Sequence, residues 1–109
     1  MITLDKFKEI ALSFPETNEQ PHFEKPSFRL GKSIFATYDS KNNLACLKLS
    51  EIDQSVFSAF NKEIIYPVPN KWGKQGWTLF DLAAVREDLF TDALTTAYYH
   101  LTLKNKRKT

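Results

Sequence analysis

The fold of this 109-residue chain is decided by residues 22–38, which read His22-Phe-Glu-Lys-Pro-Ser-Phe-Arg-Leu-Gly-Lys-Ser-Ile-Phe-Ala-Thr-Tyr38. Aromatic, aliphatic and β-branched residues concentrate in Phe28–Leu30 and Ser33–Tyr38, as is typical of β-strands. Between these segments, Gly31-Lys32 suits a two-residue type II′ turn. The stretch therefore predicts an antiparallel β-hairpin.

Further strands are predicted on the C-terminal side of this hairpin. The turn-forming run Asp39–Asn43 leads to a strand over Leu44–Leu49, which completes a three-stranded antiparallel meander. Two prolines keep Glu63–Pro69 extended and suit it to the edge of a sheet. Trp77–Leu82 has the alternation expected of another strand.

Three segments carry apolar residues at the spacing of amphipathic helices. The first begins after an N-cap at Thr3 and ends before Pro15, the second begins after Ser50, and the third spans residues 85–103. Residues 16–27 are polar and are predicted to be a loop. The stripe expected to bury the second helix consists of Ile52, Val56, Ala59 and Phe60. The predicted fold is α+β, with the element order αβββαββα.

Composition indicates one globular domain over residues 1–103. A hydrophobic content of 42%, of which one third is aromatic, excludes a disordered chain. We expect a cytoplasmic protein, because no apolar run could cross a bilayer, no signal peptide is visible, and the single cysteine cannot form an internal disulfide. We also expect a monomer, because the prolines blunt the predicted sheet edge.

Positive charge is concentrated in three segments. The last six residues hold four basic side chains, so residues 104–109 are predicted to be a flexible basic tail. Residues 20–48 have an excess of three basic residues and residues 64–80 an excess of two, whereas the rest of residues 1–103 has a net charge of −7. If the two basic segments meet in space, their combined field attracts anions.

No combination of residues indicates catalysis. His22, Cys46 and His100 lack the short spacings of metal ligands, and only three glycines are present to form a phosphate-binding loop. Cys46 is expected to act as a small core hydrophobe, and His100 is expected at the surface near a helix end. The sequence thus predicts a protein that is not an enzyme and that uses no metal or other cofactor.

A second motif, Pro69-Asn-Lys-Trp-Gly-Lys-Gln-Gly-Trp77, also places aromatic and basic residues around turn-forming residues. Trp72 is the better candidate for exposure, and Trp77 is expected to be at least half buried because it enters a strand. In the first motif the residues expected to pack in the core are Phe23, Phe28 and Phe35.

The two motifs together resemble the MmcQ/YjbR family of small bacterial proteins. The matching residues are His22-Phe-x-Lys-Pro-Ser-Phe-Arg, Phe35-Ala-Thr and Pro69-x-x-Trp-Gly-x-x-Gly-Trp77, with Leu12-x-x-Pro15-Glu16 and a long final helix around them. The family's usual Ala-Pro-Lys tail is replaced by Leu101–Lys104. The resemblance implies a fold similar to frataxin (CyaY), in which helices pack on one face of an antiparallel sheet.

The resemblance also implies DNA binding through a "double wing" of two projecting hairpins. One wing corresponds to the Gly31-Lys32 hairpin and the other to Lys71–Trp77. Basic side chains in these loops could neutralise phosphates without reading sequence, and the tryptophans could stack on exposed bases. The candidate nucleic-acid or ligand-binding residues are His22, Lys25, Arg29, Lys32, Lys71, Trp72, Lys74 and Trp77.

Two other hypotheses remain open. The same residues could converge on a pocket for an anionic small molecule or peptide. A frataxin-like metal chaperone would need an acidic ridge, but Lys6 and Lys8 interrupt Asp5 and Glu9 in the first helix. Packing of the aromatic residues alone could also explain both motifs.

Overall fold

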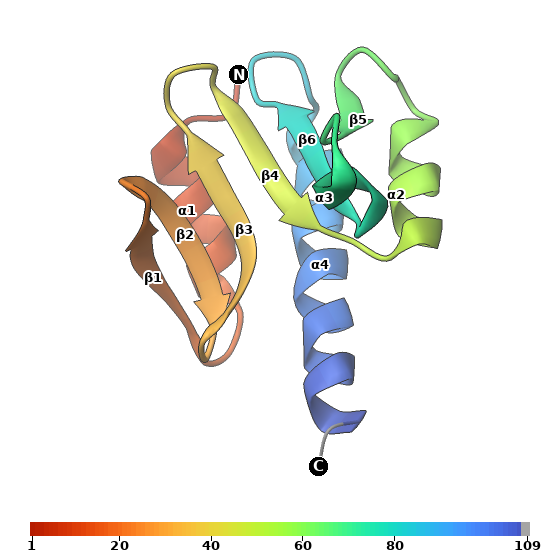
Figure 1. Ribbon diagram of the computed structural model, residues 1–109. Helices are drawn as coiled ribbons and strands as arrows, with labels where there is room; N and C mark the ends of the chain where they lie inside the picture. Colours follow the sequence, from red (N-terminus) through yellow and green to blue (C-terminus); the bar gives the residue numbers. More distant parts are fainter. Residues whose placement is uncertain (108–109) are drawn as a thin grey trace.

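The computed structural model describes the backbone of residues 1–107 and the side chains of residues 1–104. Six strands form one antiparallel sheet in the order β1-β2-β3-β4-β6-β5 (Figure 1). The elements along the chain are α1 (Leu4–Ser13), β1 (Thr17–His22), β2 (Lys25–Leu30), β3 (Ser33–Asp39), β4 (Leu44–Lys48), α2 (Glu51–Ser58), β5 (Ile65–Pro67), α3 (Lys71–Lys74), β6 (Trp77–Asp81) and α4 (Glu87–Arg107). The predicted α+β class is confirmed.

The predicted meander is confirmed, and its turns have the expected local chemistry. Leu30 pairs with Ser33 across a two-residue loop, and Gly31 has a φ of 63°, as the first central position of a type II′ turn requires. Strand β4 then pairs with both β3 and β6. A register shift at Phe28/Arg29 lets Phe35 and Ala36 both be buried.

The prediction of a loop over residues 16–27 is wrong. Strand β1 pairs along its whole length with β2, from Thr17 opposite Leu30 to His22 opposite Lys25. It is an edge strand with exposed polar side chains, so it lacks the apolar alternation that identifies strands from sequence. A hydrogen bond from the Ser27 hydroxyl to the Gln20 carbonyl also joins the two strands.

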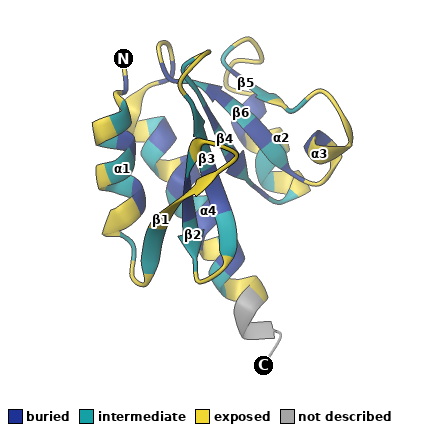
Figure 2. Ribbon diagram, turned by 60° about the vertical axis from the view of Figure 1, so that its left-hand side comes forward, coloured by how far each residue is buried: buried dark blue, intermediate teal, exposed yellow. Residues whose placement is uncertain are grey.

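Helices α1 and α4 cover one face of the sheet and leave the central part of the other face open (Figure 1). Phe7 of α1 lies between Phe28 of β2 and Phe90 of α4, with ring centroids 4.9 and 5.2 Å apart. Figure 2 shows the same division, with buried residues concentrated in the central strands and along α4. The expectation of helices packed on one face is confirmed for α1 and α4, whereas the four-residue α3 borders the open face. Phe28 and Phe35 are in the core as predicted.

Helix α2 is oriented differently from the prediction. Its N-cap forms as expected, with the Ser50 hydroxyl accepting a hydrogen bond from the Asp53 amide. However, the stripe predicted to be buried is exposed, at 77% for Ile52, 53% for Val56 and 65% for Phe60. The inward face instead carries Gln54 and Phe57.

The final helix is longer than predicted, since α4 ends at Arg107 and not at Leu103. Lys104 and the three residues after it are therefore helical. The remainder of the predicted basic tail, residues 108–109, lies outside the described residues. Within residues 1–107, no helix combines the length and apolar character needed to cross a bilayer.

Candidate ligand-binding groove

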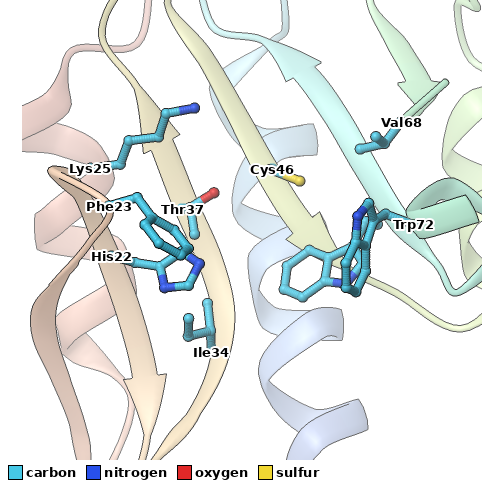
Figure 3. Close-up of a pocket in the computed structure, with 9 residues that line it drawn as sticks. His22, Phe23, Lys25, Ile34, Thr37, Cys46, Val68 and Trp72 are labelled. Atoms are coloured by element: carbon cyan, nitrogen blue, oxygen red, sulfur yellow. The ribbon is translucent and has the colours of Figure 1, made fainter. Parts of the chain in front are cut away.

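A groove of about 400 Å³ lies on the open face of the sheet, between the β1–β2 turn and α3 (Figure 3). Figure 3 shows the side chains of the β1–β2 turn on one side, Trp72 on the other, and Thr37 and Cys46 between them. The groove is lined by His22, Phe23, Lys25, Ile34, Thr37, Cys46, Val68, Trp72 and Trp77. Residues from both sequence motifs thus meet here.

The first wall is the turn that joins β1 to β2. Phe23 and Glu24 form a two-residue loop in which both have positive φ, 51° and 68°, although neither is glycine. Such a loop usually contains Asn-Gly, because bulky side chains disfavour this region. The prediction that Phe23 packs in the core is wrong: it is 86% exposed at the tip of the loop, with its ring centroid 4.6 Å from that of His22.

The second wall consists of the two tryptophans at α3 and β6. The side chain of Asn70 caps α3 by accepting a hydrogen bond from the Trp72 amide at 2.8 Å. Trp72 is 48% exposed, as expected for the surface residue of the pair. Trp77 pairs with Lys48 on β4 and is more than half buried, which confirms the prediction.

The second wall is held in place by close backbone packing. A Cβ on Gly73 would lie 2.0 Å from the Val68 carbonyl oxygen, and one on Gly76 would lie 1.8 Å from that of Leu49. The Leu49 amide donates a hydrogen bond to the Gly76 carbonyl at 3.0 Å. Gln54 of α2 also donates to the Gly73 carbonyl, at 2.9 Å. These contacts require glycine at both positions.

The floor of the groove is formed by β3 and β4. Thr37 and Cys46 are direct partners on these strands, so their side chains point to the same face. Burial raises the pKa of the Cys46 thiol to about 11, although the nearby charge of Lys25 opposes that shift. Cys46 is therefore neutral at physiological pH and lies on the groove floor, not in the core where it was expected.

Three lysines place positive charge around the groove. Lys25 lines it directly, the Lys71 ammonium lies 5.5 Å from the Trp72 ring centroid, and the Lys48 ammonium lies 6.0 Å from that of Trp77. Lys48 also donates a hydrogen bond to the Gln75 carbonyl. Burial, followed by the charge of Lys104, lowers the pKa of Lys48. The lining residues include no carboxylate, although Asp39 lies near enough for the charge of Lys25 to help lower its pKa. The three ammonium groups together make the groove attractive to anions.

The structure brings together only part of the predicted site. His22, Lys25, Trp72 and Trp77 line the groove, and Lys71 and Lys74 lie in α3 beside Trp72. Arg29 instead ties β2 to β1 by donating to the Pro21 carbonyl at 3.3 Å, and it also donates to the Ser27 hydroxyl of its own strand at 3.1 Å. Lys32 lies in the turn at the opposite end of β2 from the groove's first wall.

Sequence reasoning missed five lining residues: Phe23, Ile34, Thr37, Cys46 and Val68. Strand alternation could have placed Thr37 and Cys46 on one face, but only with the strand register known. The two residues between His22 and Lys25 were a possible signal for a tight turn. Among the described residues, no three His, Cys, Asp or Glu side chains lie close enough together to hold a metal ion.

The fold and groove define a small α+β domain with one helix-covered and one open sheet face. This chain belongs to the YjbR family, whose model matches residues 12–100, which confirms the MmcQ/YjbR resemblance. The fold is similar to that in the crystal structure of Deinococcus radiodurans protein DR2400, described as having a DUF419 domain, with a TM-score of 0.82. The two chains are 23% identical, and the match covers 96% of this chain and 82% of that one. No curated protein matches this chain.

Proposed function

We propose that this protein is a non-catalytic binding domain whose groove takes an anionic ligand carrying a flat ring. The observation that carries the proposal is the convergence of the two sequence motifs. His22 and Lys25 come from the first motif and Trp72 and Trp77 from the second, and all four line one groove.

The chemistry of the walls suits such a ligand. The faces of Trp72 and Trp77 can stack on a planar ring, which contributes about 1–3 kcal/mol for a stacked base. Lys25, with Lys48 and Lys71 nearby, can neutralise a carboxylate or phosphate attached to that ring. The volume of about 400 Å³ falls within the ordinary range for small-molecule sites.

A non-catalytic role is supported by the floor of the groove. The Cys46 thiol is neutral, and the reactive form of cysteine is the thiolate. We infer that the groove binds its ligand without transforming it.

A second candidate function is single-stranded nucleic acid binding on the same face. It is favoured by Trp72, which is 48% exposed on a helix that also carries Lys71 and Lys74. Ring stacking needs unpaired bases, so this geometry favours a single strand over a duplex. The Gly31-Lys32 wing of the family's "double wing" lies outside the groove.

Intrinsic tryptophan fluorescence provides the main test, because the chain has two tryptophans and both line the groove. We expect a saturable change in emission on titration with nucleoside monophosphates or aromatic carboxylates. Lys25→Glu should weaken binding at least about tenfold, whereas the matched change Lys62→Glu, outside the groove, should not. If no probe in either class changes the emission, the proposed function is wrong.

Salt dependence separates the two candidates. For a single-stranded oligonucleotide, the logarithm of the affinity should fall with the logarithm of salt concentration, with a slope of about −0.7 for each phosphate contacted. Exchanging Lys71 and Lys74 for Glu should reduce that slope by about 1 or more. If monophosphates bind strongly but the affinity for oligonucleotides does not fall with salt concentration in this way, the nucleic-acid function is wrong and the small-molecule function is supported.

A further inference from the structure

The positive charge inside the groove is smaller than the number of nearby lysines suggests. Among the lining residues, all of which the structure describes, Lys25 is the single lysine. Ser27 pairs with Thr37, so Lys25 and Asp39, each two residues away from that pair, lie opposite one another on the same face of the sheet. The pKa of Asp39 is lowered, first by a hydrogen bond from the Asn42 side chain and to a smaller extent by the charge of Lys25. A carboxylate beside Lys25 therefore offsets part of its positive field.

The two other lysines near the groove belong to its second wall. The Lys48 ammonium lies 6.0 Å from the centroid of the Trp77 ring, and the Lys71 ammonium lies 5.5 Å from that of Trp72. Figure 3 shows Lys25 on the opposite side of the groove from Trp72. The three ammonium groups therefore do not surround one point, and an anion beside Lys25 is balanced mainly by that one side chain.

This distribution of charge favours a ligand with a single negative charge. A phosphate monoester carries a charge of about −1.5 to −2 at pH 7, and it binds best to several donors or to the planar fork of an arginine. Arg29 of the same motif is held by its hydrogen bonds to Pro21 and Ser27. A carboxylate carries one charge, which one ammonium can balance.

The groove also separates its charged side from its aromatic side. Lys25, Thr37, Cys46 and Trp77 lie on four successive strands of the sheet, β2, β3, β4 and β6. Neighbouring strands are about 4.8 Å apart, so the distance from β3 to β6 alone is roughly 10 Å. Between the two sides, the floor presents the Thr37 hydroxyl and the neutral Cys46 thiol. A ligand that contacts both sides is therefore elongated, and an uncharged chain suits its middle.

We propose that the ligand is an elongated aromatic monocarboxylate, in which a short aliphatic chain joins one ring to one carboxylate. The carboxylate pairs with the Lys25 ammonium, the chain crosses Thr37 and Cys46, and the ring stacks on the wall formed by Trp72 and Trp77. This inference rests on the proposed function, because it names the class of ligand that the same groove takes.

Tryptophan fluorescence of the full chain tests the inference with a set of phenyl compounds. Hydrocinnamate should bind at least about tenfold more tightly than benzoate, which is too short to reach both sides of the groove. It should exceed its own uncharged amide, hydrocinnamamide, by a similar factor of about ten. It should also bind at least about threefold more tightly than phenethyl phosphate, which carries the same ring on a dianionic group.

Lys25→Gln removes the ammonium without reversing its charge. It should weaken hydrocinnamate binding at least about tenfold and change the affinity for hydrocinnamamide by less than about twofold. Lys32→Gln is the matched control, because Lys32 lies in the turn at the other end of β2. This control should leave both affinities unchanged.

Asp39→Asn tests the balance of charge directly, and it keeps a side-chain oxygen that can accept the hydrogen bond from the Lys41 amide. The Asp39 carboxylate repels a dianion nearly twice as strongly as a monoanion at the same distance. The variant should therefore raise the logarithm of the affinity nearly twice as much for phenethyl phosphate as for hydrocinnamate. Equal gains for the two compounds would contradict the inferred role of this carboxylate.

The outcomes separate this inference from the proposed function. If benzoate or phenethyl phosphate binds as tightly as hydrocinnamate, the inferred ligand class is wrong and the proposed function stands. The same conclusion follows if nucleoside monophosphates bind and hydrocinnamate does not. A preference for hydrocinnamate over its amide that persists in Lys25→Gln would overturn the contact assigned to Lys25. If no anion of either class changes the emission, the proposed function itself is wrong.

Discussion

The two sequence motifs have similar compositions, but different interactions determine their conformations. In the first, Phe23 and Glu24 occupy left-handed conformations at the tip of a turn, and Phe23 is 86% exposed. In the second, Gly73 and Gly76 sit where a Cβ would lie about 2 Å from a backbone oxygen. The first motif therefore presents side chains at some cost in conformational strain, whereas the second is locked by close packing. Similar composition does not imply a similar structural role.

The largest effect should come from Gly76→Ala, which tests the packing of the second motif. Its φ of 104° is unfavourable for alanine, and the new Cβ would collide with the Leu49 carbonyl oxygen. We expect a loss of about 3 kcal/mol or more in the free energy of unfolding, measured by urea denaturation.

Gly31→Ala is the matched control for that substitution. Gly31 also has a positive φ, of 63°, but a Cβ there would meet nothing within 4 Å. We therefore expect a loss of only about 1 kcal/mol, from backbone strain alone. Equal losses for the two glycines would contradict the proposed difference between the motifs.

The next effect concerns the link between the second motif and α2. Gln54→Leu removes an amide whose two N–H hydrogens are shared among three acceptors, the Gly73 and Trp77 carbonyls and the Thr78 hydroxyl. We expect a loss of about 2 kcal/mol in unfolding free energy, because these acceptors are partly buried and lose a donor. Gln75→Leu is the control: its side chain is exposed, so a change of less than about 0.5 kcal/mol is expected.

A smaller and opposite effect is expected in the first motif. Replacing Phe23 by Asn together with Glu24 by Gly supplies residues that favour the left-handed turn, and should stabilise the protein by about 1 kcal/mol. The same change removes an aromatic side chain from the groove, so it should also weaken ligand binding. Phe23→Ala alone should show no gain in melting temperature, and a gain there would mean that turn strain is not the cause.

The smallest effect is expected for Trp72→Ala, which separates function from packing within the second motif. Since Trp72 is 48% exposed, its removal should change the unfolding free energy by less than about 1 kcal/mol in thermal or urea denaturation. Trp77→Ala should cost more, because Trp77 is more than half buried in a strand. A larger loss for Trp72 would indicate that its role is mainly structural.

Sequence patterns predicted the turns and helix ends that are determined by neighbouring residues in the chain. The Gly31-Lys32 turn, the caps at Thr3 and Ser50 and the end of α1 before Pro15 depend on residues within a few positions of one another. Strand β1 was missed because an edge strand needs no apolar alternation, only a partner with free backbone groups. Helix α3 was missed because it comprises only four residues.

The candidate site was predicted only in part, for a related reason. His22, Lys25, Trp72 and Trp77 could be selected from composition, but their convergence depends on the pairing of distant strands. Thr37 of β3 pairs with Cys46 of β4, and Cys46 pairs with Leu79 of β6. This register determines which side chains lie together on the open face. Arginine is a common phosphate-binding residue, yet the hydrogen bonds of Arg29 hold two strands together.

The sequence by itself determined the family, the α+β class, most of the strands and the basic, aromatic character of the two motifs. Only the tertiary structure decided that part of each motif lines a single groove and that the apolar row of α2 faces outward. The physical reason is that turn and helix preferences come from neighbours along the chain. Strand register and helix rotation come from contacts such as those of Gln54, whose partners lie 19 or more residues away.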